Sequence, residues 1–253
     1  GTDLELRRAR WLGRGLYGVD ADRRQRQTYD EHRSENASPT HAPPPGPEAT
    51  LQPEVAGSLL EIGRAAGHSL RVIDDLDDAA EEMRRAIAGS VSTKLDVHSP
   101  CEGWTVRDVI NHVVTGNLRT LAWTHEENGP RNEEDHLAGD PLGAFDDSFL
   151  RVRARLADLL VRGVPVRTPF AVLSAERLID MRCTELTVHA WDVARATGQP
   201  TDFLPELCER LAAIARADIE GLDRAASPFG VEQRPPPGAS AADRLAAFFG
   251  RPG

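Results

Sequence analysis

The sequence has no long apolar run and few cysteines. No apolar stretch approaches the roughly 20 residues that a bilayer-spanning helix needs, so we expect a soluble protein. The three cysteines, Cys101, Cys183 and Cys208, are an odd number at wide, irregular spacing, which fits neither a disulfide framework nor a zinc ribbon. This usage indicates a reducing compartment, and we expect the protein to be cytoplasmic.

The sequence is also short of basic charge. It has 30 Lys and Arg against 40 Asp and Glu, a net charge of −10. Because nucleic acids and anionic membranes bind basic surfaces, neither is expected as a general partner, and a small-molecule substrate is favoured. The start, GTDLELRRARW, has neither an initiator Met nor a charged stretch followed by an apolar block, so no secretory signal is expected.

Strand signals are missing as well. No hairpin dipeptide lies between alternating apolar runs, and the β-branched residues fall at helical spacing. Apolar residues at that spacing predict helices in six segments: 53–87, which a break near Gly67 could divide, 105–127, 140–163, 174–197, 205–222 and 239–253. The fold class expected is all-α, one domain built around a four-helix bundle with an extra C-terminal helical segment.

The first 53 residues differ from the rest. They are Arg-rich at first, and residues 34–53, SENASPTHAPPPGPEATLQP, form a Pro-rich polar tract that cannot bury a core. We expect residues 1–53 to be an N-terminal extension and linker, and residues 54–253 to be the helical domain. The extension could bind a partner protein, or it could carry no chemistry.

The segment CTELTVHAWDVARATGQP, residues 183–200, carries two ionisable residues on its apolar face. On a helical wheel Glu185 and His189 lie within about 40° of Leu178 and Ala196. Burying an ionised carboxylate without a partner costs several kcal/mol, so a Glu there must be protonated, paired with a cation or bound to a metal. Spacing i, i+4 also occurs on solvated faces, so the pair alone is a weak signal.

A second histidine strengthens the pattern. His112 falls at the edge of the apolar arc of the predicted helix 105–127, beside Gly116, whose missing side chain leaves room. Two His and one Glu from two helices match a zinc-type site that keeps a position open for water or substrate. Taken alone, His112 could equally be a core histidine that donates to a helical carbonyl.

Three segments carry a family resemblance: SPCEGWTVRDVINHVVTGN, RCTELTVHAWDVARATGQP and DRLAAFFGRPG. They resemble the DinB-like metal-binding superfamily, in particular its actinobacterial branch related to mycothiol-dependent maleylpyruvate isomerase. The resemblance runs from about residue 55 to the C-terminus. It implies a DinB-like bundle with a divalent metal held by His112, Glu185 and His189, and mycothiol or another low-molecular-weight thiol as cosubstrate.

Other residues near these three have more than one interpretation. Asp192 could orient a ligand or a bound water, or it could pair with Arg195 on the surface. Arg182 could pair with Glu185 or with a substrate carboxylate.

Trp104 and Trp191 are expected to pack in the core, although one of them could border a pocket. Three further residues are expected to have no role in the site. Cys183 is expected to be a small packing residue. His125 and His136 are expected to be solvated residues of a loop that could cover the site.

Three functions follow from this pattern. In the first, the protein is a metal-dependent enzyme, a thiol transferase or isomerase that activates a thiol or water for addition to an electrophile. In the second, the bundle is a non-catalytic metal-binding scaffold or sensor whose N-terminal arm binds a protein. In the third, the metal has been lost and Glu185 and His189 bind Arg182 or Asp192. Zinc is the metal expected first, with nickel or iron as alternatives. The sequence leaves the oligomeric state open.

Overall fold

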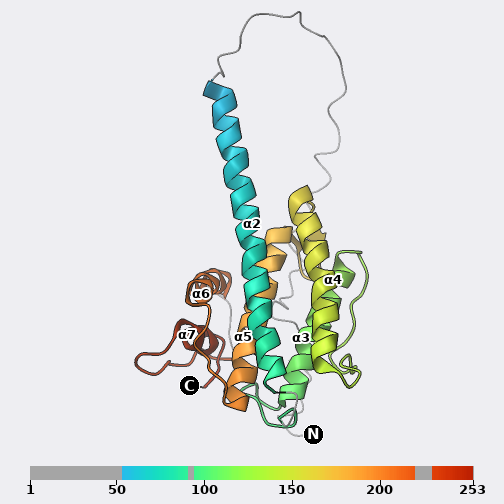
Figure 1. Cartoon of the computed structure of the whole chain (residues 1–253), viewed down its shortest axis with the longest axis vertical. Helices are drawn as coiled ribbons and strands as arrows, with labels where there is room; N and C mark the ends of the chain where they lie inside the picture. Colours follow the sequence, from blue (N-terminus) through green and yellow to red (C-terminus); the bar gives the residue numbers. More distant parts are fainter. Residues whose placement is uncertain (1–52, 91–93, 220–229, 253) are drawn as a thin grey trace, which may run out of the picture.

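The structure is a computed structural model, and it describes residues 53–90, 94–219 and 230–252. Nearly all of its regular structure is helical, as the sequence predicts (Figure 1). The elements, in chain order, are α2 (Pro53–Ala88), α3 (Val106–Trp123), α4 (Pro141–Arg162), β1 (Val166–Arg167), β2 (Val172–Leu173), α5 (Ala175–Thr197), α6 (Pro205–Ile219) and α7 (Ala241–Phe248). The predicted N-terminal extension comprises residues 1–53, of which residues 1–52 lie outside the described residues and Pro53 begins α2.

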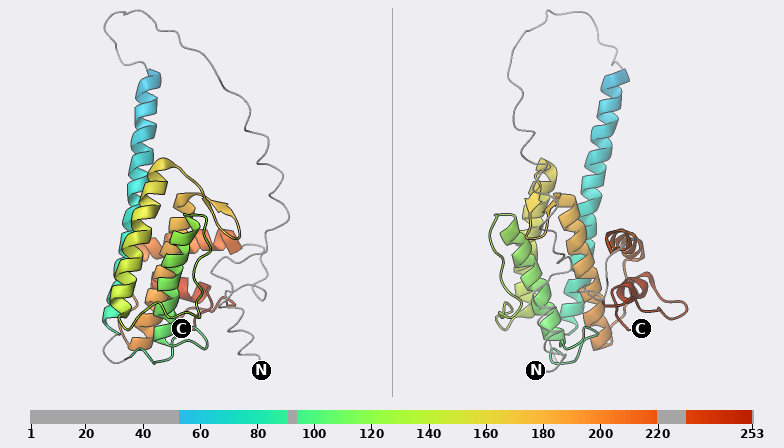
Figure 2. Two further views of the ribbon diagram at one scale, coloured as in Figure 1. Left: turned by 90° about the vertical axis from the view of Figure 1, so that its right-hand side faces the viewer. Right: turned by 180° about the vertical axis from the view of Figure 1, so that it is seen from behind.

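Helices α2, α3, α4 and α5 pack side by side, and α6 and α7 form the extra C-terminal segment. In Figure 1 the N-terminal half of α2 extends beyond the other helices, while its C-terminal half lies along α5. The views in Figure 2 place α6 and α7 on the side of α5 away from α3 and α4. Helix α5 therefore has neighbours on several sides, since it contacts α2, α3, α4, α6 and α7.

This central position explains the burial of α5. Every residue from Leu178 to Ala194 is buried except Asp180 and Glu185, which are partly buried. The helical wheel predicted one apolar stripe, but α5 is covered almost all round, because the C-terminal helices close its second face. Its polar residues therefore need partners inside the protein.

The ends of the site helices follow local rules. Thr105 caps α3: its Oγ1 accepts a hydrogen bond from the backbone N–H of Asp108 at 3.2 Å, and the Asp108 carboxylate accepts one from the Thr105 N–H at 2.9 Å. Ser174 caps α5 by accepting a hydrogen bond from the Arg177 N–H. Gly198 ends α5 in the left-handed conformation, at φ 73°. These caps confirm both predicted helices.

Two details differ from the prediction. Helix α2 runs without interruption through Gly67, so the break considered there is wrong; one helical Gly costs about 1 kcal/mol, which a long helix tolerates. A two-residue antiparallel pair, with Val166 opposite Leu173, joins α4 to α5. Strands of two residues cannot show an alternating pattern, and therefore no pattern in the sequence predicts them.

The C-terminal segment is tied to α5 by polar and apolar contacts. Trp191 of α5 donates from Nε1 to the carboxylate of Asp243 at 2.8 Å. Leu245 and Phe248 of α7 are buried. Within the described residues, no helix has the length and apolar character to span a bilayer.

Candidate metal centre

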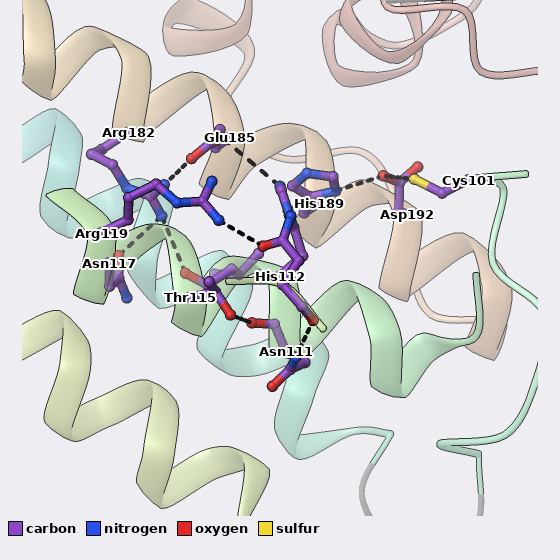
Figure 3. Close-up of polar contacts among 12 residues, drawn as sticks. Cys101, Asn111, His112, Thr115, Asn117, Arg119, Arg182, Glu185, His189 and Asp192 are labelled. Atoms are coloured by element: carbon purple, nitrogen blue, oxygen red, sulfur yellow. Dashed lines mark hydrogen bonds and ion pairs between the residues drawn. The ribbon is translucent and has the colours of Figure 1, made fainter. Parts of the chain in front are cut away.

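The polar residues predicted for the site meet in one buried cluster between α3 and α5 (Figure 3). His112 comes from α3, whereas Arg182, Glu185, His189 and Asp192 lie on successive turns of α5. His112, Arg182, His189 and Asp192 are at most 3% exposed, and the Glu185 side chain is 13% exposed. The structure therefore brings together all five residues that the sequence singled out.

His112, Glu185 and His189 are close neighbours. The Nε2 atom of His112 lies 3.8 Å from Oε1 of Glu185, and the rings of His112 and His189 meet edge to face with centroids 5.0 Å apart. Donor atoms that bind one tetrahedral zinc at about 2.0–2.1 Å lie roughly 3.4 Å from each other. The His112–Glu185 distance is close to that spacing, and the small adjustments of a metal site would close the difference.

Asp192 orients His189. The Nδ1 atom of His189 lies 2.9 Å from Oδ2 of Asp192, and in Figure 3 the imidazole lies between Asp192 and His112. Because Nδ1 is engaged by the carboxylate, Nε2 is the nitrogen on the side of His112. Metal-binding histidines commonly have this arrangement, in which a carboxylate fixes the tautomer and the ring plane. Of the two roles considered for Asp192, these contacts match the orienting one; Arg195 instead lies over the Trp191 ring.

Arg182 holds Glu185 from the opposite side. Its Nη1 pairs with Oε2 of Glu185, and its Nη2 donates to Oδ1 of Asn117 at 3.0 Å. A Cβ at Gly116 would lie 2.5 Å from Nη1 of Arg182 and 3.2 Å from Oε2 of Glu185, so glycine is needed there. The pair uses one carboxylate oxygen, and the other, Oε1, faces His112.

Burial sets the protonation states of these groups. Desolvation lowers the pKa of His112 and of His189, so both imidazoles are neutral at pH 7, the form that binds metals. Burial lowers the pKa of Arg182 to about 9, which leaves it protonated. Burial alone would raise the pKa of Asp192, but the charge of Arg251 and a hydrogen bond with His189 hold it well below its usual value.

A second group of possible metal ligands shares His189. One ligand atom from each of Cys101, His189 and Asp192 lies within 4.8 Å of the other two. However, Nη2 of Arg251 lies 2.9 Å from Oδ2 of Asp192 and 3.1 Å from the Cys101 sulfur. Burial also raises the pKa of the Cys101 thiol, which disfavours the thiolate that a metal requires. A cation bound by Cys101, His189 and Asp192 would face the guanidinium of Arg251. Electrostatic repulsion therefore disfavours a metal at that position and favours one on the side of His112. The ligand set His112, Glu185 and His189 stays a prediction.

A cavity of about 430 Å³ opens beside His112. Trp104 forms part of its wall, and the Trp104 ring lies 5.0 Å from that of His112 and 6.4 Å from that of His189, between centroids. Trp104 therefore borders a pocket as well as packing in the core. The rest of the wall comprises Arg107, Asp108, Asn111, His112, Asn132, Glu133, Glu134 and Asp135.

The loop between α3 and α4 forms the outer wall of this cavity. Asn111, next to His112, donates from Nδ2 to the backbone carbonyls of Asn132 and Glu134 and accepts from the His136 N–H. Arg119 adds a hydrogen bond to the Asn132 side chain at 3.0 Å. The loop thus lines the cavity beside His112.

The remaining sequence candidates lie away from the cluster. His125 is exposed and His136 partly buried in the loop, whereas Cys183 is buried with a pKa raised by desolvation. Sequence reasoning missed Cys101, Asn117 and Arg251. All three lie in the segments that carry the family resemblance. Nothing in their local pattern marks the contact of Asn117 with Arg182, or those of Cys101 and Arg251 with Asp192.

The comparisons with known proteins agree with this fold. The family model described as the mycothiol maleylpyruvate isomerase N-terminal domain matches residues 76–194, which contain His112, Glu185 and His189. Two proteins of Mycobacterium tuberculosis, from strains CDC 1551 / Oshkosh and ATCC 25618 / H37Rv, are each 34% identical over 174 residues. That alignment covers 68% of this chain and 93% of each relative, and both relatives are named uncharacterized proteins.

No solved structure matches the chain significantly. The family is nevertheless shown by the long alignment with the two relatives and by the family model, which covers the bundle from the middle of α2 to the end of the site on α5. The chain belongs to the mycothiol maleylpyruvate isomerase N-terminal domain family.

Proposed function

We propose that the protein is a metal-dependent enzyme that activates a small thiol, or water, for addition to an electrophilic small molecule. His112, Glu185 and His189 would hold a divalent metal, with zinc expected first and nickel or iron as alternatives. The observation that carries this proposal is the convergence of two neutral imidazoles and one carboxylate oxygen next to a cavity of about 430 Å³, which His112 lines.

The residues around the proposed ligands fit a metal. Arg182 pairs with Oε2 of Glu185, and Oε1 of Glu185 lies 3.8 Å from Nε2 of His112. Asp192 contacts Nδ1 of His189, so Nε2 of His189 lies on the side of His112. The hypothesis of a lost metal predicts the same two contacts. The cavity beside His112 favours the metal instead.

The cavity also favours an enzyme over a scaffold. A structural metal site is closed by a fourth protein ligand, whereas a catalytic site keeps a position open for water or substrate. His112 lines a cavity large enough for a small molecule, which is the arrangement expected for an open position. The proposed N-terminal arm of the scaffold hypothesis lies outside the described residues.

When bound, the metal would lower the pKa of a thiol or water, so that a thiolate or hydroxide forms at neutral pH. The protein's own groups have separate tasks. Arg182 holds the Glu185 carboxylate in place, Asp192 fixes the His189 ring, and Trp104 shields both imidazoles from solvent. The loop fastened by Asn111 limits the approach to the cavity.

Membership of the family supports a thiol as the activated group. The name of the family refers to mycothiol and maleylpyruvate isomerase, and we propose that this protein is a thiol transferase or isomerase of that type. The thiolate sulfur would form a bond to an electrophilic carbon while the C=C π bond opens and its electrons form an enolate. With an unsaturated acid, rotation about the new C–C single bond and loss of the same sulfur would restore the double bond in the isomer and release the thiolate. With other unsaturated electrophiles, a proton from solvent would quench the enolate and the thioether would be the product.

The proposal is tested by thiol addition with matched histidine variants. The full chain, loaded with zinc, is assayed with mycothiol and a panel of electrophiles that includes an unsaturated diacid. We expect His112→Ala to lower the rate of addition by at least about 100-fold, because the metal is lost. The control, His125→Ala, changes an exposed loop histidine and should leave the rate unchanged. Equal rates for the wild type and His112→Ala would refute the proposal.

A further inference from the structure

Arg251 follows the end of α7, and its side chain contacts α5, the helix that carries Glu185 and His189. Its side chain is buried, at 7% exposure, and binds Asp192 with two nitrogens: Nε to Oδ1 at 3.1 Å and Nη2 to Oδ2 at 2.9 Å. Its Nη1 donates to the carbonyl of Phe249 at 3.0 Å, and Nη2 also lies 3.1 Å from the Cys101 sulfur. The guanidinium is therefore fixed by three parts of the chain.

The backbone is shaped to deliver this side chain. Gly250 has φ 86°, in the left-handed region that favours glycine. A Cβ at Gly250 would also lie 2.6 Å from the Cα of Gly230. The Arg251 N–H then donates to the carbonyl of Ala246 at 3.0 Å, which turns the chain back against α7. The sequence Phe-Phe-Gly-Arg thus closes the helix and points Arg251 toward α5.

Asp192 joins Arg251 to His189. Its Oδ2 atom contacts Nδ1 of His189 at 2.9 Å and Nη2 of Arg251 at 2.9 Å. A carboxylate with a single partner can rotate about its terminal torsion, whereas a fork with two parallel hydrogen bonds from Arg fixes the plane of the carboxylate. The orientation that accepts a proton from His189 Nδ1 is therefore set by Arg251.

We propose that Arg251 is a positioning residue for the metal centre: through Asp192 it holds His189 with the proton on Nδ1 and Nε2 turned toward His112. The inference rests on the proposed function, in which His189 binds the metal. It adds that the C-terminal segment, although distant from His112 and Glu185 in the sequence, sets how well the centre binds a metal.

The alternative is that Arg251 only fastens the C-terminal segment. The two roles differ in what a conservative change does. Lysine keeps the charge and can still tie the segment to Asp192, but as a point charge it cannot form the fork. A structural role would move only the unfolding temperature, whereas a positioning role would move the His189 tautomer and the metal affinity.

The experiment measures the His189 tautomer and the metal affinity in the full chain. Nitrogen-15 NMR of the metal-free protein reports the His189 tautomer, and titration with Co²⁺ reports the affinity. For Arg251→Lys and Arg251→Gln we expect a loss of the single Nδ1–H pattern of His189 and a Co²⁺ affinity about 10- to 100-fold weaker, the usual effect of removing such an outer partner. The control is Arg244→Gln on the exposed side of α7, where Arg244 pairs with Glu209; both readouts should stay at the wild-type values.

Arg251→Lys keeps the experiment decisive if Arg251→Gln does not fold. An Arg251→Lys protein that folds and keeps both the wild-type His189 tautomer and the wild-type Co²⁺ affinity would overturn the proposal. The NMR readout needs no metal. If the wild type binds no Co²⁺ but the tautomer changes in Arg251→Lys, then the proposed metal function fails while the positioning of His189 by Arg251 stands.

Discussion

Asp180 and Asp192 lie on the same helix, twelve residues apart, in opposite electrostatic situations. The side chain of Asp180 is 21% exposed and its contact with Arg177 is long, at 4.0 Å. Asp192 is fully buried, but His189 and Arg251 bind it at 2.9 Å. Burial raises the pKa of Asp180 to about 6, whereas Arg251 and His189 hold the pKa of Asp192 well below its ordinary value despite deeper burial.

The difference shows what keeps a carboxylate ionised inside this helix. Desolvation favours the neutral acid at both positions, and only close partners with good geometry reverse it. Asp192 has such partners and Asp180 does not. The partners of Asp192 therefore keep its carboxylate ionised beside His189, whereas burial at Asp180 favours the neutral acid.

The largest effect is expected for Asp192→Asn. The change removes the countercharge of Arg251 and leaves a guanidinium buried, which typically costs about 3–5 kcal/mol. Urea unfolding at pH 7 should show that loss in the free energy of unfolding. Asp180→Asn is the matched control on the same helix and should not destabilise the protein. Equal effects of the two variants would remove the distinction drawn between these acids.

An intermediate effect is expected for Gly116→Ala. Alanine normally stabilises a helix relative to glycine, but here its Cβ would lie 2.5 Å from Nη1 of Arg182. Displacing the buried Arg182–Glu185 pair should cost about 1–3 kcal/mol. Gly67→Ala, in α2 with no atom within 4 Å of the added Cβ, should instead stabilise by up to about 1 kcal/mol. Thermal and urea unfolding measure both, and a stabilised Gly116→Ala protein would contradict the tight packing inferred there.

The smallest effect is the pH dependence at Asp180. Its pKa in the folded protein, about 6, lies above the ordinary value of 3.8, so folding favours the protonated acid. That contribution is fully present below about pH 4 and is lost as the pH rises through 6. A pKa raised from 3.8 to about 6 corresponds to about 3 kcal/mol, and the partial exposure of the side chain reduces this value. Asp180→Asn should therefore be more stable than the wild type by about 1–2 kcal/mol at pH 7.5, with little difference near pH 4. Unfolding at both pH values measures it, and a pH-independent difference would show that Asp180 keeps its ordinary pKa.

The sequence predicted the helices well because their signals are local. The capping box of Thr105 and Asp108, the Ser174 cap and the glycine stop at Gly198 each depend on residues three or four apart, or on one position. Glu185 and His189 stood out for a similar reason, since a polar residue in an apolar pattern is visible within one helix. Their partners Arg182 and Asp192 lie on the same helix, and therefore they too could be identified from the sequence.

The missed residues depend on contacts between distant segments. Arg251 and Cys101 are separated by 150 positions and meet only because α7 packs against α5. The burial of α5 on nearly all sides has the same origin, since no pattern within α5 shows that α6 and α7 cover it. Contacts of this kind follow from packing, and a single sequence does not encode them at any fixed spacing.

Binding of a divalent metal by His112, Glu185 and His189 can be measured as the metal content of the purified protein. The full chain is prepared without chelators or added metal and analysed for zinc, nickel and iron, beside His189→Ala and the loop control His125→Ala. We predict about one metal ion per chain in the wild type and in His125→Ala, and less than about a tenth in His189→Ala. A metal-free wild type that also fails to take up zinc on titration, or a His189→Ala protein with full metal content, would contradict the account.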